Sequence, residues 1–295
     1  MNEINATQPI EVSEGKYNFW RYLLVTITIV ITTLVTQTIL LFIASLFEGD
    51  FDVMQYSPIT LLWVFMLPFA ALLISLVFGI RLVHKQSVRS IFTQKSFFSK
   101  NLLFKSFVLW FLLSGISDVV LSIFQPENYA FTFNINTFVP YMLIAVFLVL
   151  IQITAEEVLF RHYFLHGFLR LCRISWIAIF AQAILFGILH GANPEVTAYG
   201  LLTTMPFYIG MGLIFGWFSY RSKGLEIALG LHYANNLYAT LMVTFEESAI
   251  PSPALFTINN YQPELSLLIF VFMAIVFYLI MIPVMKKDNL EKTSI

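Results

Sequence analysis

Long apolar stretches are the feature of this sequence that most restricts what the chain can fold into. A helix of about 20 mostly apolar residues is long enough to cross the roughly 30 Å hydrocarbon core of a bilayer. Only 11% of the 295 residues are charged, whereas soluble domains carry roughly a quarter. Apolar stretches occur near residues 20–47, 57–83, 102–124, 138–169, 174–192, 197–220, 225–245 and 264–285. The sequence therefore predicts an all-α polytopic membrane protein of about eight transmembrane helices.

The positions of the basic residues predict how these helices are oriented. Cytoplasmic loops of membrane proteins are enriched in Lys and Arg. Apart from Arg161, all 16 basic residues fall at the two ends of the chain or in alternate connections: Lys16, Arg21, Arg81, Lys85, Arg89, Lys95, Lys100, Lys105, Arg170, Arg173, Arg221, Lys223, Lys286, Lys287 and Lys292. The remaining connections carry Glu48, Asp50, Asp52, Glu127, Glu195, Glu246, Glu247 and Glu264. Both termini are therefore predicted to be cytoplasmic.

The chain is interpreted as a single membrane domain over residues 1–295, with residues 1–19 as a cytoplasmic tail. It contains no internal repeat and no linker long enough to separate domains. The first apolar stretch is too long for a signal-peptide core and is expected to be retained. The one cysteine, Cys172, implies neither a disulfide nor a structural metal site. The lipid bilayer is the expected environment, and nothing indicates nucleic acid as a partner.

Ionisable residues inside transmembrane segments are costly and usually functional, and here they concentrate in the second half of the chain. Glu157 and Arg161 are four residues apart, so they lie on one helix face and can form an ion pair. Glu156 points about 100° away from Glu157 and has no such partner in its own helix. Glu156 is therefore the better candidate for a general base that activates water.

Two further segments carry polar residues of suitable chemistry. If the fourth and fifth stretches form a hairpin near Arg173, Glu156 and His190 lie at the same depth in the membrane. His232 and Asn236 are one helical turn apart, so both can donate hydrogen bonds toward one point. Such donors are suited to stabilising an oxyanion. His232, however, begins only about ten residues beyond Arg221, so its depth does not obviously match that of Glu156.

These three segments resemble the motifs of the CAAX protease and bacteriocin-processing (CPBP, or Abi) family of intramembrane endopeptidases, particularly the type II CAAX prenyl endopeptidases. The family patterns are Glu-Glu-x-x-x-Arg, Phe-x-x-x-His and His-x-x-x-Asn. This chain contains all three in the family's order, within a catalytic core expected over residues 138–240. They are formed by Glu156, Glu157 and Arg161, by Phe186 and His190, and by His232 and Asn236.

The resemblance implies a role for each matching residue. Glu156 would activate water, and His190 would share the proton transfer. His232 and Asn236 would form the oxyanion hole, while Glu157 and Arg161 support the site. No cofactor is needed in that interpretation. Zinc is the alternative, with Glu156, His190 and His232 as ligands of suitable type.

Other polar residues have simpler explanations. His162 and His166 are also four apart, as a metal-binding pair can be, but a solvated helix face is the expectation for both. Asp118 is expected to be a hydrogen-bonding partner between packed helices. Glu226 is expected at the start of the seventh transmembrane helix, where a negative charge is favourable.

The function expected from the sequence is an endopeptidase that hydrolyses a peptide or protein substrate presented at the membrane. A bacterial cell membrane is the expected location. A bacteriocin immunity protein or a membrane scaffold without catalytic activity is the first alternative. A secondary transporter using Glu156 and the histidines as proton sites is another, although inverted repeats typical of transporters are absent from the sequence.

Overall fold

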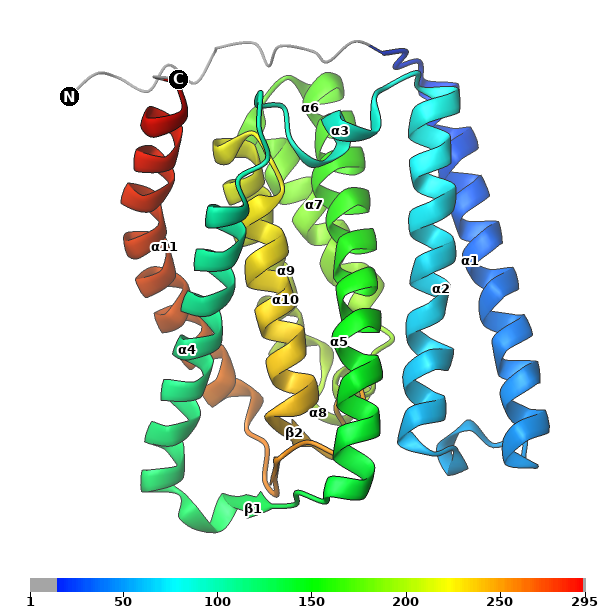
Figure 1. Cartoon of the computed structure of the whole chain (residues 1–295), viewed down its shortest axis with the longest axis vertical. Coiled ribbons are helices and arrows are strands. Elements are labelled where there is room, and N and C mark those ends of the chain that lie inside the picture. Colours follow the sequence, from blue (N-terminus) through cyan, green and yellow to red (C-terminus); the bar gives the residue numbers. More distant parts are fainter. Residues whose placement is uncertain (1–14, 294–295) are drawn as a thin grey trace.

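The computed structural model describes residues 15–293, which form an almost entirely helical bundle (Figure 1). The predicted tail over residues 1–19 lies mostly outside these residues, since residues 1–14 are not described. The α-helices are α1 (Phe19–Glu48), α2 (Pro58–Phe78), α3 (Val88–Phe92), α4 (Lys100–Phe124), α5 (Ile135–Glu157), α6 (Leu165–Cys172), α7 (Ser175–His190), α8 (Pro194–Tyr199), α9 (Leu201–Ser222), α10 (Glu226–Leu241) and α11 (Pro263–Thr293). The predicted all-helical membrane architecture is confirmed.

Six helical segments of the described residues are long and apolar enough to cross a membrane. They are Phe19–Glu48, Pro58–Val83, Lys100–Phe124, Ile135–Cys172, Leu201–Ser222 and Pro263–Asp288. The other two stretches predicted from the sequence form α7 and α10, which have only 16 residues each. At 1.5 Å per residue each spans about 24 Å, less than the hydrocarbon core. The structure thus supports six to eight apolar helices rather than eight equivalent spans.

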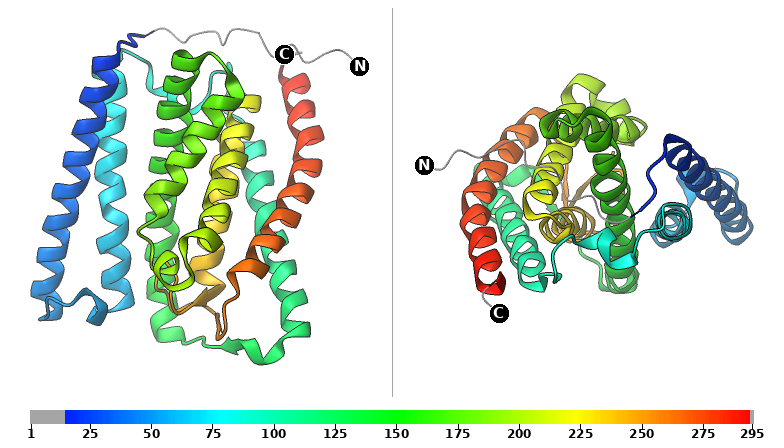
Figure 2. Two further views of the ribbon diagram at one scale, coloured as in Figure 1. Left: turned by 180° about the vertical axis from the view of Figure 1, so that it is seen from behind. Right: turned by 90° about the horizontal axis from the view of Figure 1, so that it is seen from above.

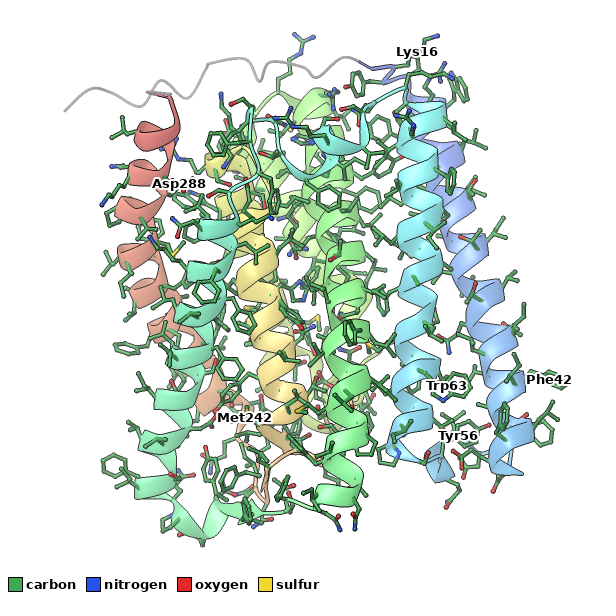
Figure 3. All side chains as sticks on the ribbon, viewed as in Figure 1. Lys16, Phe42, Tyr56, Trp63, Met242 and Asp288 are labelled. Atoms are coloured by element: carbon green, nitrogen blue, oxygen red, sulfur yellow. The ribbon has the colours of Figure 1, made fainter. Side chains whose placement is uncertain are left out.

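Helix α10 lies at the centre of the bundle, where it packs against α4, α5 and α9 (Figure 2). Twelve of its residues are buried. Gly230 makes the close approach to α4 possible, because a Cβ atom there would overlap the Ser106 hydroxyl and the Leu103 carbonyl. Helices α1 and α2 stand at one side of the bundle, and α2 provides the contact with α5 (Figure 2). Phe42 on α1 points outward and is 58% exposed, as expected for a side chain facing lipid (Figure 3).

The start of α1 and the end of α11 lie at the same end of the bundle (Figure 1). Lys16 and Asp288 are at this end in Figure 3, and the connections that carry the basic residues gather here as well. The opposite end holds the acidic connections and a small three-stranded sheet of β1 (Tyr129–Phe131), β3 (Phe256–Ile258) and β2 (Val243–Phe245), in that order. Strand β3 pairs antiparallel with β1 and parallel with β2.

Helix α5 continues into α6 through a π-helical segment, Val158–Phe164, which begins directly after the two adjacent glutamates. π-helical turns inside α-helices are frequent at functional sites. The chain then reverses at Arg173, which adopts the left-handed conformation with φ 57°, and α7 follows. The hairpin predicted near this residue is therefore present, and it places α7 beside the α5–α6 helix (Figure 2).

Candidate active site

Glu157 lies at the centre of a buried charged group formed by α5, the π-helical segment and α10. Its Oε2 atom is 3.3 Å from Nε of Arg161, and its Oε1 atom accepts a hydrogen bond of 2.8 Å from Nδ1 of His232. Glu157 is fully buried, and Arg161 is 1% exposed. The ion pair expected from the spacing of Glu157 and Arg161 is therefore present. The doubt about the depth of His232 is also removed, because α10 brings it directly against Glu157.

The Arg161 guanidinium is held between aromatic rings. Its Cζ atom lies 4.4 Å from the ring centroid of Phe186 and 4.6 Å from that of Phe215. Phe215 also stacks on the imidazole of His232, with ring centroids 4.6 Å apart. Cation–π contacts of this kind are strongest where water is excluded. The two phenyl rings thus fix Arg161 and His232 in a largely apolar environment.

Glu156 has one carboxylate oxygen held and the other without a hydrogen-bond partner. Its Oε1 atom accepts a 2.6 Å hydrogen bond from Nε2 of Gln152, one turn earlier on α5. Its Oε2 atom is buried, forms no hydrogen bond among the described residues, and lies 3.7 Å from Nε2 of His232. Because a carboxylate oxygen with free lone pairs accepts a proton readily, Oε2 is the atom available to a water molecule.

His190 belongs to the same region but makes no hydrogen bond to Glu156 among the described residues. Its Nδ1 atom donates to the Phe186 carbonyl over 2.7 Å, so the Nε2 atom of the neutral ring carries the lone pair. The imidazole stacks on Tyr208 of α9, with centroids 4.5 Å apart. The Tyr208 hydroxyl is in turn hydrogen-bonded to Asn193 and Glu195. Phe186 contacts both His190 and His232, with centroid distances of 4.3 and 6.1 Å.

Asn236 lies near the carboxylates, and its amide is engaged by two neighbours. Its Nδ2 atom donates to Oε1 of Gln152 over 3.0 Å, and its Oδ1 atom accepts from Nδ2 of Asn235 over 3.1 Å. One N–H of the Asn236 amide group is not used in these bonds. Asn236 is therefore connected to Glu156 through Gln152, a link that its spacing from His232 did not indicate.

The structure brings Glu156, Glu157, Arg161, His232 and Asn236 together, and it adds residues that the sequence analysis missed. Gln152 is the most important of them. It is 6% exposed and four residues before Glu156, so its position within an apolar span was a signal for it. Phe215 and Tyr208 gave no such signal, because aromatic residues are common throughout the chain.

The expectation for His162 and His166 was wrong. His162 is 5% exposed rather than solvated, and its Nε2 atom pairs with Oε1 of Gln86 at 3.1 Å. His166 is partly buried and lies 2.7 Å from Nε2 of Gln94. Both histidines are covered because the connection between α2 and α4 folds over this end of the π-helical segment. Asp118, in contrast, accepts a hydrogen bond from Tyr129 as expected.

The zinc alternative has no preformed site in this geometry. The part of the chain that the structure describes contains no group of three or more His, Cys, Asp or Glu side chains placed to hold a metal ion. Glu156 and His232 are adjacent, but His190 does not join them to complete a ligand set.

Together, the fold and the site define a polytopic membrane protein with a buried carboxylate, imidazole and amide cluster. Residues 137–238 match the family model described as type II CAAX prenyl endopeptidase Rce1-like. This chain therefore carries an Rce1-like domain of the CPBP family, as the motifs indicated. Such a domain implies a protease that acts on a protein substrate at the membrane.

One curated relative is similar over a large part of the chain. It is the uncharacterized protein YyaK of Bacillus subtilis (strain 168), which is 29% identical over 187 residues. The similar region covers 63% of this chain and 62% of the relative. No solved structure matches this chain.

Proposed function

We propose that this protein is an intramembrane endopeptidase in which Glu156 activates the attacking water. The observation that carries the proposal is the division of labour between the two oxygens of Glu156. Gln152 holds Oε1, whereas the buried Oε2 has no hydrogen-bond partner and faces Nε2 of His232. A positioned base of this kind, beside a donor for the oxyanion, is what amide hydrolysis requires.

The reaction begins with a water molecule hydrogen-bonded to Oε2 of Glu156. Oε2 takes one proton while the water oxygen forms a bond to the peptide carbonyl carbon. The carbonyl oxygen becomes an oxyanion, for which Nε2–H of His232 and the unused N–H of Asn236 are the donors. When the carbon–nitrogen bond breaks, the proton passes to the leaving amine. The products are a carboxylic acid and an amine, and Glu156 is again ionised.

The charges around His232 favour its role as an oxyanion donor. Its Nδ1–H donates to Glu157, which as a carboxylate paired with Arg161 can only accept. The charges of Glu156, Glu157 and Arg161 sum to minus one, and a doubly protonated His232 makes the group neutral. A neutral group is favoured in a medium of low dielectric constant. In that state Nε2 also carries a hydrogen and can donate it to the oxyanion.

His190 would assist proton transfer rather than form the oxyanion hole. Because its Nδ1–H is fixed by the Phe186 carbonyl, its Nε2 can accept a proton from water or return one to the leaving amine. The stacked ring of Tyr208 limits rotation of the imidazole. A direct hydrogen bond to Glu156 is not needed, because one water molecule can bridge the two.

The end of the bundle that carries the basic residues and both chain termini is proposed to face the cytoplasm. The positive-inside rule supports this orientation, and the relative from Bacillus subtilis supports a bacterial cell membrane. The substrate would then be a membrane-presented peptide segment that is cleaved within the single domain. A prenylated CAAX segment is the substrate class suggested by the description of the matching family.

The test is cleavage of a library of membrane-presented peptides, prenylated and unprenylated, by protein purified in detergent and returned to vesicles. Glu156→Gln and His190→Ala should both abolish or strongly reduce cleavage. The matched controls are Glu264→Gln, at an exposed carboxylate of the opposite end, and His166→Ala. Both controls should retain activity.

The same assay separates the alternatives. Activity that survives a zinc chelator supports water activation by Glu156 alone, whereas loss on chelation and recovery with zinc supports the metal-dependent version. Folded protein that cleaves no peptide, with or without zinc, would favour an immunity or scaffold role.

A further inference from the structure

A continuous chain of side-chain hydrogen bonds runs from α4 through α10 to the carboxylate of Glu156. The indole Nε1 of Trp110 donates to Oδ1 of Asn235 over 3.2 Å. Asn235 donates to Asn236 over 3.1 Å, and Asn236 donates to Gln152 over 3.0 Å. Gln152 completes the chain by donating to Oε1 of Glu156 over 2.6 Å.

The chemistry of its two ends fixes the direction of this chain. An indole N–H can only donate, so the oxygen of Asn235 must face Trp110 and its NH2 group must face Asn236. An ionised carboxylate can only accept, so the NH2 group of Gln152 must face Glu156. Both ends therefore require the same orientation of the three amides between them. Trp110 is 1% exposed and Gln152 is 6% exposed, so water does not readily replace either contact.

We propose that Gln152 is a positioning residue for Glu156 and that Trp110, through Asn235 and Asn236, sets its orientation. Gln152 immobilises Oε1 of Glu156 and so assigns the reaction with water to Oε2, which has no hydrogen-bond partner of its own. This inference rests on the proposed function, because it explains how the base of that reaction is held. Charge-assisted hydrogen bonds of this type are among the stronger ones in proteins.

The chain also connects the two halves of the site. Asn236 is the proposed oxyanion donor, and the N–H that it gives to Gln152 leaves its second N–H for the substrate. The same amide orientation therefore serves both the base and the oxyanion. If the chain were reversed, the oxygen of Gln152 would face the Glu156 carboxylate and repel it.

The first experiment replaces Gln152 with leucine, which can neither accept from Asn236 nor donate to Glu156. With the cleaved library peptide as substrate, we expect kcat to fall roughly tenfold or more with KM nearly unchanged. Gln37→Leu on α1 is the matched control, because it removes the same amide from a helix that does not contribute to the site. A wild-type kcat in the Gln152→Leu variant would overturn the proposal.

The second experiment reverses the chain from a distance. Asn235→Asp keeps the acceptor for Trp110 but removes the donor to Asn236, so the amides beyond it turn around. We expect kcat to fall about as far as in Gln152→Leu, although residue 235 does not contact Glu156. In the Gln152→Leu background the same substitution should have no further effect. An equal loss in both backgrounds would mean that the new charge acts directly, and the proposal would fail.

A donor-only substitution tests the far end of the chain. Trp110→Phe removes the indole N–H but keeps an aromatic ring against Phe270 and Phe277. We expect a several-fold fall in kcat, while Trp63→Phe on α2 leaves kcat unchanged. Equal kcat values for the two variants would remove Trp110 from the proposal.

Thermal unfolding separates failure of this inference from failure of the proposed function. The Tm values of wild type, Gln152→Leu, Asn235→Asp and the double variant form a cycle that needs no catalytic activity. Non-additive Tm changes show that the residues act as one chain, even if no peptide is cleaved by the wild type. Additive Tm changes would overturn the chain whether or not the protein is a protease.

Discussion

The Nδ1 atom of His232 lies 2.8 Å from Oε1 of Glu157, which connects the centre of α10 to the end of α5. Glu157 thereby fixes which imidazole nitrogen faces Glu156. Because Arg161 pairs with the other oxygen of Glu157, the carboxylate stays ionised and continues to accept from His232. The second glutamate of the motif thus supports a histidine rather than reacting itself.

The buried ion pair leads to the first prediction. Arg161→Met should destabilise the protein by about 3–5 kcal/mol, because it leaves the Glu157 carboxylate buried without its partner. Adding Glu157→Gln should restore part of that stability, since it removes the uncompensated charge. Thermal unfolding in detergent measures both. A double variant less stable than Arg161→Met alone would contradict this explanation.

The helices and the hairpin at Arg173 could be predicted because lipid imposes long apolar stretches that are visible in the sequence. The short lengths of α7 and α10 could not, since these helices are bounded by contacts with other helices. Likewise, the burial of His162 depends on Gln86, 76 residues earlier in the chain. The three strands have three residues each and carry no usable pattern.

The candidate site could be predicted in part. The spacing of Glu157 and Arg161 correctly indicated their ion pair, because both residues are on one helix. The interactions of Gln152 with Glu156 and Asn236 combine a local contact with one between α5 and α10. Only the local part is expressed in sequence spacing, so the chain that ends at Trp110 becomes visible only in three dimensions.

His84 gives the protein a pH-dependent contribution to stability. Burial lowers the pKa of His84 below its ordinary value of 6.5, and the imidazole contacts the Lys16 carbonyl and the Tyr163 hydroxyl. The unfolded chain therefore binds a proton more readily than the folded one, so stability should fall as the pH drops below about 6.5. Tm measured from pH 8 to pH 5 should fall less in His84→Gln than in wild type. Parallel curves would contradict the prediction.

Gly230 is predicted to be intolerant of any side chain. Alanine there would push against the Leu103 carbonyl, a backbone atom that cannot rotate away, and should cost about 1–3 kcal/mol in stability. Gly115→Ala on α4 is the matched control, since its Cβ would lie 3.9 Å from the nearest atom, in Tyr238. That control should be neutral or slightly stabilising, because alanine favours helices. Similar Tm losses in both variants would argue against the close approach.

Tyr208 is predicted to matter for catalysis through the orientation of His190. Its ring stacks on the imidazole, and its hydroxyl is held by Asn193 and Glu195. Tyr208→Leu should lower kcat about tenfold with little change in KM, because the imidazole can then leave its productive orientation. Tyr208→Phe keeps the ring but loses the hydroxyl contacts, so its kcat should lie between those of Tyr208→Leu and wild type. If phenylalanine were no better than leucine, the stacking would have no role, and the effect would belong to the hydroxyl and Glu195.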